Sequence, residues 1–113
     1  MTIEIQGIPE SNLIAIIDTG SDKTLINREL LDKMQWVTEP GTITRNGLNG
    51  TIQVEVCKNA KITFPNSLYE DTVDVEVFTS QNHGAVMCIL GTDILNKSII
   101  IYNGPANICT LSF

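Results

Sequence analysis

The sequence lacks the features on which several functional classes depend. Among its 113 residues, seven Lys and Arg face 13 Asp and Glu, and no basic cluster occurs, which argues against binding to a nucleic-acid backbone. No apolar run approaches the roughly 20 residues of a membrane-spanning helix, so no membrane partner is expected. The first residues have neither a basic n-region nor a signal-peptide core, so secretion is not expected.

Cysteine and histidine are also scarce. Cys57, Cys88 and Cys109 lie far apart and form no Cys-x-x-Cys pair, and His83 is the only histidine. A disulfide framework and a zinc site are therefore both unexpected. Reduced thiols in or near a core are the simpler interpretation. We accordingly predict no metal site and a reducing, cytosolic environment.

Short strand patterns dominate what is present. Residues 13–17 are apolar throughout, as in a strand buried on both faces, whereas residues 72–78 alternate and place Asp74 and Glu76 on a face that meets water. Strands are expected over residues 2–5, 13–17, 43–56 (as a hairpin), 60–64, 72–78, 86–90, 98–102 and 107–111. This many short strands with little helix predict one all-β domain over residues 1–113.

Turn and cap residues mark the connections. Two Asn-Gly steps within residues 46–50 predict the tip of a hairpin, and residues 103–105 predict a second one. Asn27 is a candidate cap for a short helix over residues 29–34, and Asp93 is a candidate cap for another. The helices are thus expected to be short and to lie between strands.

Asp18-Thr19-Gly20 is the sequence that points to chemistry. It directly follows the apolar segment, where a carboxylate is costly unless something satisfies or uses it. The glycine lets backbone amides approach that carboxylate closely. An Asx-turn at a strand end would be the structural alternative. Two further elements make the pattern specific: the Asn-Gly hairpin, and then Ile89-Leu90-Gly91 leading into a short helix.

This ordered set resembles the retropepsins, the single-domain aspartic proteases of retroviruses, pararetroviruses and related retroelements. The similarity covers nearly the whole chain, and the form Ile89-Leu90-Gly91-Thr92-Asp93 is similar to that of plant pararetrovirus and retrotransposon enzymes. The resemblance implies a closed, barrel-like all-β fold with a flap hairpin and one short C-terminal helix.

The resemblance also implies a function: an aspartic endopeptidase that cleaves its parent viral or retroelement polyprotein, bound as an extended peptide. Because the chain has one Asp-Thr-Gly, two Asp18 residues from the two subunits of a homodimer would activate the water, and no cofactor is expected. The site of action would be the host cytoplasm or the viral particle. The alternative is a catalytically silent retropepsin-like domain used for dimerisation or peptide binding; a small unrelated β-sandwich is a weaker one.

The family pattern assigns roles by position. Thr19 would hydrogen-bond across the dyad to the partner's backbone, Gly20 would approach the substrate backbone, and Asp22 would meet the substrate main chain farther from the cut. The flap tip would be Gly47, Leu48, Asn49 and Gly50, and the apolar side-chain pockets would be lined by Ile16, Leu25, Leu48, Met87 and Ile89.

Three departures from the family pattern carry expectations of their own. Thr92 stands where most retroviral enzymes have the Arg that pairs with the Asp equivalent to Asp22, so Asp22 must find another partner or stay solvated. Ser21 replaces an Ala, and we expect its hydroxyl to bond the Asp18 carboxylate. Few residues precede Asp18, so we expect the dimer sheet to be built from C-terminal hairpins alone.

Overall fold

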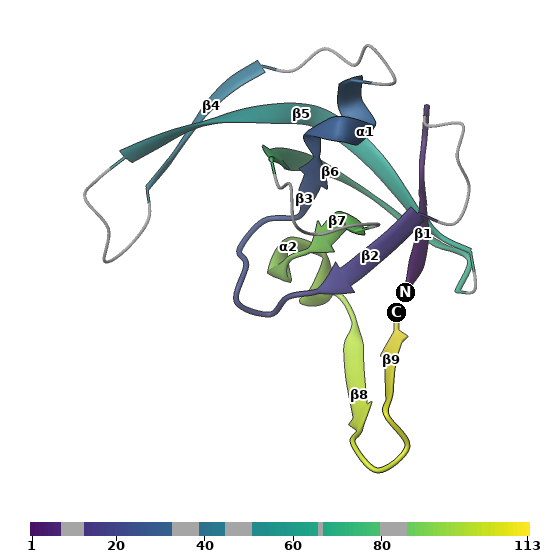
Figure 1. Ribbon diagram of the computed structural model, residues 1–113. Helices are drawn as coiled ribbons and strands as arrows, with labels where there is room; N and C mark the ends of the chain where they lie inside the picture. Colours follow the sequence, from purple (N-terminus) through teal and green to yellow (C-terminus); the bar gives the residue numbers. More distant parts are fainter. Residues whose placement is uncertain (8–12, 33–38, 45–50, 66, 80–85) are drawn as a thin grey trace.

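A computed structural model describes residues 1–7, 13–32, 39–44, 51–65, 67–79 and 86–113 (Figure 1). The strands are β1 (Thr2–Ile5), β2 (Leu13–Ile17), β3 (Leu25–Asn27), β4 (Glu39–Thr44), β5 (Thr51–Phe64), β6 (Tyr69–Phe78), β7 (Val86–Leu90), β8 (Ile99–Asn103) and β9 (Ile108–Ser112). The helices are α1 (Arg28–Asp32) and α2 (Thr92–Leu95). None of the helices in these described ranges is long and apolar enough to cross a membrane.

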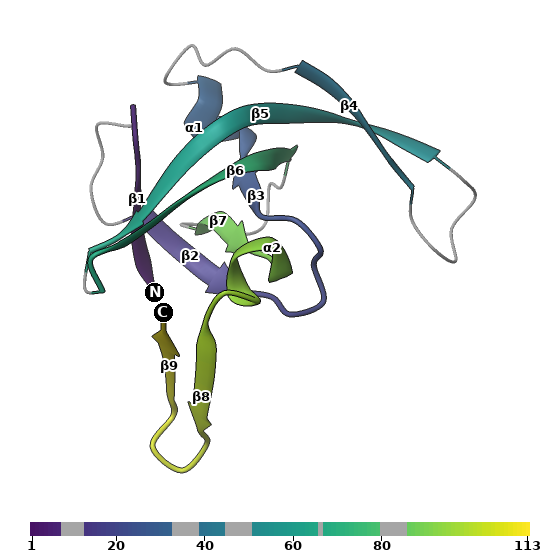
Figure 2. The same ribbon diagram turned by 180° about the vertical axis from the view of Figure 1, so that it is seen from behind.

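Strands β1 to β7 form one sheet that closes into a barrel. The order is β1-β2-β7-β3-β6-β5-β4, and β1 also pairs with β5, so that β4 alone lies outside the closed part (Figures 1 and 2). β2 runs parallel to β7, and β3 runs parallel to β6. The expected all-β barrel is confirmed. Its interior is filled by aliphatic side chains from nearly every strand and from both helices, among them Ile3, Ile26, Leu30, Ile62, Leu90 and Ile94.

β2 is buried on one face only. Leu13 and Ala15 point into the core, whereas Ile14 is 44% exposed and Ile16 is 40% exposed. The expectation that this strand is buried on both faces was therefore wrong. Successive side chains of a strand point to opposite faces, and among the described residues only the barrel side of β2 is covered.

β5 is one long strand where the sequence suggested two. Its pairing with β6 shifts register between Cys57 and Ala60, and Asn59 within the shift has a φ of 56°. The Asn59 N–H donates to Asp74 Oδ1 at 2.9 Å, so the β6 carboxylate satisfies the backbone that the bulge frees. The apparent break between two strands is thus a β-bulge within one.

Glu76 of β6 was expected on a face that meets water, and this expectation was wrong. Only 5% of Glu76 is exposed, although alternation along β6 puts it opposite the core. The reason is that β6 is an interior strand at this point, since Glu76 faces Leu25 of β3 on one side and Val56 of β5 on the other. Its N–H also donates to the Thr24 carbonyl oxygen at 3.0 Å.

The two helix caps differ in outcome. Asn27 Oδ1 accepts the Glu29 N–H at 3.1 Å, which confirms Asn27 as the cap of α1. For α2 the capping position is occupied by Gly91, which has no side chain to offer, so the predicted Asp93 cap was wrong. Asp93 lies inside the first turn, where its carboxylate accepts the Ile94 N–H and also two donors of Thr24.

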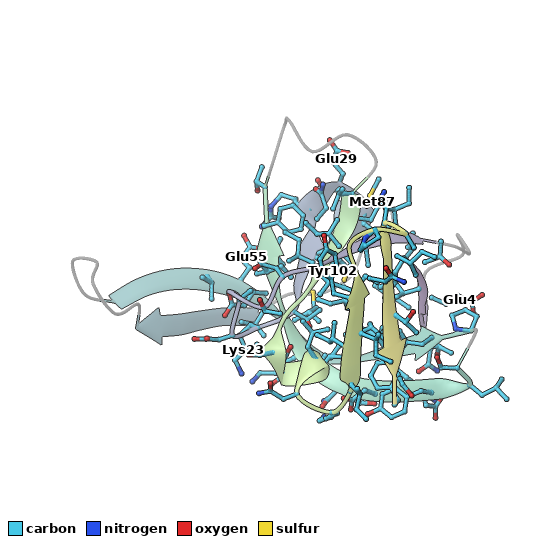
Figure 3. The ribbon with its side chains drawn as sticks, turned by 90° about the horizontal axis from the view of Figure 1, so that it is seen from below. Glu4, Lys23, Glu29, Glu55, Met87 and Tyr102 are labelled. Carbon is cyan, nitrogen blue, oxygen red and sulfur yellow. The ribbon has the colours of Figure 1, made fainter. Side chains whose placement is uncertain are left out.

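β8 and β9 form a separate hairpin that projects away from the barrel (Figures 1 and 2). This confirms the second predicted hairpin. At its base Leu111 is buried, and Phe113 stacks on Tyr69 with ring centroids 4.1 Å apart and an angle of 8° between the ring planes. Farther out the side chains are open, and Ile99 is 67% exposed and Tyr102 75% exposed. Figure 3 shows the hairpin from below, with Tyr102 on it.

Candidate active site

Asp18 lies at the end of β2, where the chain enters the loop that leads to β3 beside α2 (Figure 1). Its N–H donates to the Leu90 carbonyl oxygen of β7 at 3.0 Å, which fixes the backbone of Asp18 to the neighbouring strand. Its Oδ1 accepts the Gly20 N–H at 2.9 Å. A Cβ at position 20 would lie 3.1 Å from that oxygen, so glycine gives the amide its close approach. Asp18, Thr19 and Gly20 are all exposed.

Ser21 does not contact the Asp18 carboxylate. Its hydroxyl donates to the Lys23 carbonyl oxygen at 2.7 Å, and its N–H donates to the Asp18 carbonyl oxygen at 3.2 Å. The expected Ser21–Asp18 side-chain bond was therefore wrong. The Ser21 hydroxyl bonds a backbone acceptor two residues farther along the loop. Ser21 therefore stabilises the loop rather than the carboxylate.

Gly91 brings the end of β7 against this loop. A Cβ at Gly91 would overlap the carbonyl carbon and oxygen of Lys23 and would lie 2.8 Å from the Ser21 carbonyl oxygen. The adjacent Thr92 N–H donates to that same Ser21 oxygen at 2.8 Å. The Ile89-Leu90-Gly91 motif and Asp18-Thr19-Gly20 are therefore in direct backbone contact, which explains why the two occur together.

Thr24 and Asp93 form a second link between the loop and α2. Thr24 is fully buried, and its N–H and hydroxyl donate to Asp93 Oδ2 and Oδ1 at 3.0 and 2.7 Å. The same hydroxyl accepts the Gly91 N–H at 3.2 Å. Sequence reasoning missed Thr24 altogether. The only available signal was an unassigned threonine just before a strand, and a partner 69 positions away leaves no local pattern.

Three of the predicted pocket residues lie in one row across adjacent strands. Ile16 of β2 is in register with Ile89 of β7, and Ile89 is in register with Leu25 of β3. Residues in register on adjacent strands point to the same face, so the three side chains line the outer face of the barrel next to Asp18. Met87 lies two positions before Ile89 and shares that face. Glu76 continues the row beside Leu25, which alternation on β6 alone did not reveal.

The other predicted site residues are Asp22 and the residues of the flap tip. Asp22 is exposed, and within the described part of the chain no hydrogen bond or ion pair to its carboxylate occurs. The flap-tip residues Gly47, Leu48, Asn49 and Gly50 lie outside the described residues. The arms leading to them are described as paired strands, with Thr44 of β4 facing Thr51 of β5.

An ion pair joins the base of this β4–β5 arm to the barrel. Arg28 of α1 contacts the Glu55 carboxylate of β5, and this hydrogen bond raises the pKa of Arg28 (Figure 3 labels Glu55). Both side chains are partly exposed, so the pair contributes little to stability by itself. It does give the arm a defined contact with the body of the molecule.

Cys88 lies directly beneath the site. It is fully buried on β7, and burial, with a smaller effect of Asp93, raises its pKa to about 12. The thiol is therefore a neutral core group at physiological pH. Among the described residues, no cluster of His, Cys, Asp and Glu is arranged to hold a metal ion.

Comparisons with known proteins bear on this geometry. A family model described as aspartyl protease matches residues 1–94. Among solved structures, the chain is similar to the EIAV protease complexed with the inhibitor HBY-793, with a TM-score of 0.58 and 17% sequence identity. That match covers 86% of this chain and 84% of that chain. No curated protein sequence matches this one. The structural likeness confirms the fold that the sequence predicted.

Proposed function

Because the chain belongs to the aspartyl protease family and has the retropepsin fold, we propose that it is an endopeptidase whose active site forms between two copies. Each copy contributes one Asp18. The observation that carries the proposal is the position of Asp18, exposed at a strand end and held on both its backbone and its carboxylate. A group arranged in this way is oriented and open to a reactant.

The chemistry needs two carboxylates that share one proton across a water molecule. One carboxylate takes a proton from the water as general base, while the protonated carboxyl group of the other donates a hydrogen bond to the scissile carbonyl oxygen. The water oxygen attacks the carbonyl carbon, and a proton then passes to the departing amine. Like charges this close do not both ionise, so the pair acts as a unit. Water is the nucleophile, so the reaction as proposed uses no cofactor.

Two features, one of the sequence and one of the hairpin, support a second copy. One Asp-Thr-Gly per chain supplies half of the pair. The hairpin of β8 and β9 exposes Ile99, Ile101, Tyr102 and Ile108 together, which is unusual for a surface that meets only water. We propose that two hairpins meet about a twofold axis and bring the two Asp18 residues together. Thr19, which is exposed next to Asp18, would bond the partner's backbone.

The substrate side of the proposal follows the row of apolar residues. Ile16, Leu25 and Ile89, with Met87, would receive apolar side chains of an extended peptide, Gly20 would approach its backbone, and Asp22 would accept its main-chain N–H groups. The flap tip over residues 47–50 would close over it and exclude water. We propose the parent viral or retroelement polyprotein as the substrate, cleaved in the host cytoplasm or the viral particle; the support is the resemblance carried by residues 89–93.

The test is cleavage of a peptide with a bulky apolar junction at about pH 5, by wild type, Asp18→Asn and Asp32→Asn over a range of protein concentrations. Asp32 is an exposed carboxylate at the end of α1 and serves as the matched control. We expect Asp18→Asn to lose about 10²–10⁴-fold in rate. Asp32→Asn should match wild type, whose specific activity should rise with concentration and be blocked by a statine-type inhibitor.

Two outcomes would contradict the proposal. Cleavage that persists in Asp18→Asn would exclude this residue as the catalytic group. A wild-type protein that is a stable dimer in sedimentation, yet cuts none of a library of apolar junction peptides, would favour a silent dimerisation or peptide-binding domain.

A further inference from the structure

The loop over residues 18–24 is tied to α2 by hydrogen bonds that converge on one carboxylate. Asp93 Oδ1 accepts the Thr24 hydroxyl at 2.7 Å and the Ile94 N–H at 2.9 Å, and Oδ2 accepts the Thr24 N–H at 3.0 Å. We propose that Asp93 is a positioning residue for catalysis, which holds Asp18 in place by acting through Thr24. The expected effect on kcat rests on the proposed protease function.

Every polar atom of Thr24 takes part in a hydrogen bond. Its N–H and hydroxyl donate to Asp93, its hydroxyl accepts the Gly91 N–H, and its carbonyl oxygen accepts the Glu76 N–H at 3.0 Å. Every polar atom of a fully buried residue is thus engaged. A buried donor that loses its partner is costly, so Thr24 cannot shift without breaking several bonds at once.

A path of hydrogen bonds and peptide bonds links Thr24 to Asp18. The Thr24 hydroxyl holds the Gly91 N–H, and Gly91 directly follows Leu90, whose carbonyl oxygen holds the Asp18 N–H at 3.0 Å. Gly91 also lies against the Lys23 backbone with no room for a side chain. The path from Asp93 through Thr24 and Gly91 to Leu90 therefore ends on the backbone of Asp18. Loss of the Asp93 carboxylate would remove the two hydrogen bonds that hold Thr24.

The charged group that holds the loop over residues 18–24 is the Asp93 carboxylate. Position 92 carries Thr, and the Thr92 N–H donates to the Ser21 carbonyl oxygen, so the backbone of that residue contacts the loop. Asp22 has no ion pair within the described part of the chain. The loop is therefore held by a carboxylate that accepts backbone and hydroxyl donors, and a charge-assisted bond of this kind is stronger than a neutral one.

The experiment compares Asp93→Ala, Asp93→Asn, Thr24→Val and Asp74→Ala. Asp74 is the matched control, because its carboxylate also accepts a backbone N–H from a distant residue but lies on the β5–β6 bulge. Values of kcat and KM are measured at a protein concentration that saturates activity and at a temperature where each variant is folded. Amide hydrogen exchange of residues 18–24 is measured on the same samples.

We expect Asp93→Ala and Thr24→Val to lower kcat by about 10- to 100-fold with KM changed less than about threefold, because misplacement of a reacting group acts mainly on the chemical step. Exchange over residues 18–24 should rise in both. Asp93→Asn, which keeps one acceptor oxygen, should recover part of the loss. Asp74→Ala should lower thermal stability and leave kcat and loop exchange unchanged.

The proposal is overturned if Asp93→Ala and Thr24→Val keep the wild-type kcat and loop exchange, or if Asp74→Ala reproduces their effect on both. Thr24→Val has nearly the wild-type shape and keeps the test open if Asp93→Ala fails to fold. If the wild-type protein itself cleaves nothing, the proposed function fails, whereas hydrogen exchange still decides whether Asp93 positions the loop.

Discussion

At the scale of single residues, the site depends on two glycines whose lack of a Cβ permits close contacts. Gly20 leaves room for an amide on the Asp18 carboxylate, and Gly91 leaves room for the Lys23 carbonyl group. Gly20 meets a carboxylate of its own loop, whereas Gly91 meets the backbone of another segment. A side chain at position 91 would push apart the two segments that carry the motif residues.

We predict that Gly91→Ala destabilises the fold by about 1–3 kcal/mol. The added methyl group would overlap the backbone of Lys23, which cannot move aside as a flexible side chain could. Urea unfolding measures the change. Gly104→Ala is the matched control, since a Cβ there would lie 3.5 Å from a Tyr102 ring carbon, an ordinary contact. Equal midpoints for the two variants would contradict the close approach at Gly91.

At the scale of secondary structure, the bulge in β5 shows how one side chain can bond a backbone group that strand pairing leaves without a partner. The Asn59 N–H and the Lys58 ammonium group both bond Asp74, and these contacts lower the pKa of Asp74 below its usual value of 3.8, with the Asn59 bond the larger cause. The folded state therefore favours the charged carboxylate. A lowered pKa stabilises the fold above the unfolded pKa, and this contribution is lost as the pH falls through the folded pKa.

We predict that Asp74→Asn is less stable than wild type near pH 7 and that the difference disappears at a pH well below 3.8, where Asp74 is protonated in both states. The urea midpoint measured from pH 7 to pH 2 checks this. Glu4→Gln, an exposed change on β1, controls for the loss of one negative charge. A difference that persists or grows in acid would show that the stabilisation has another source.

At the scale of the whole molecule, the position of the hairpin matters as much as its surface. The hairpin leaves the barrel after α2 and returns to it through Leu111 and Phe113. Phe113 contacts Phe64 at a centroid distance of 4.7 Å as well as stacking on Tyr69. This aromatic cluster fixes the direction in which the hairpin points, and so the geometry in which a second copy would meet it.

We predict that Phe113→Ala raises the dissociation constant of the proposed dimer about tenfold, since one aromatic pair contributes about 0.5–1.5 kcal/mol beyond its buried area. Sedimentation at several concentrations gives that constant, and Ser112→Ala, an exposed neighbour, is the control. The rate per dimer at saturating concentration should be unchanged. An unaltered dissociation constant would mean that the hairpin holds its direction without Phe113.

Much of the fold could be predicted from local patterns. The hairpin turns and the Asn27 cap are recorded in residues near one another. The motifs Asp18-Thr19-Gly20 and Ile89-Leu90-Gly91 could be found as short patterns, whereas their contact is seen only in the structure. A turn residue or a cap acts on its own backbone, so its signal survives in the sequence alone.

The features that the sequence did not reveal depend on partners that lie far away along the chain. Glu76 is buried because β3 and β5 flank it, Ile16 is exposed because no part of the chain that the structure describes covers its face, and Thr24 meets Asp93 only after the barrel closes. Alternation gives the face of a strand, but it does not say which neighbour covers that face.

The hairpin also sets a choice between finite and endless assembly. Within the described residues β8 and β9 pair only with each other, so each strand keeps an edge whose backbone groups can bond another chain. A twofold contact uses the same edge on both copies and stops at two. A contact of β8 with β9 of the next copy leaves a fresh edge at every addition and grows into a fibre. If two copies pair through this hairpin as proposed, the symmetry of their contact, rather than its affinity, decides whether assembly stops at two copies.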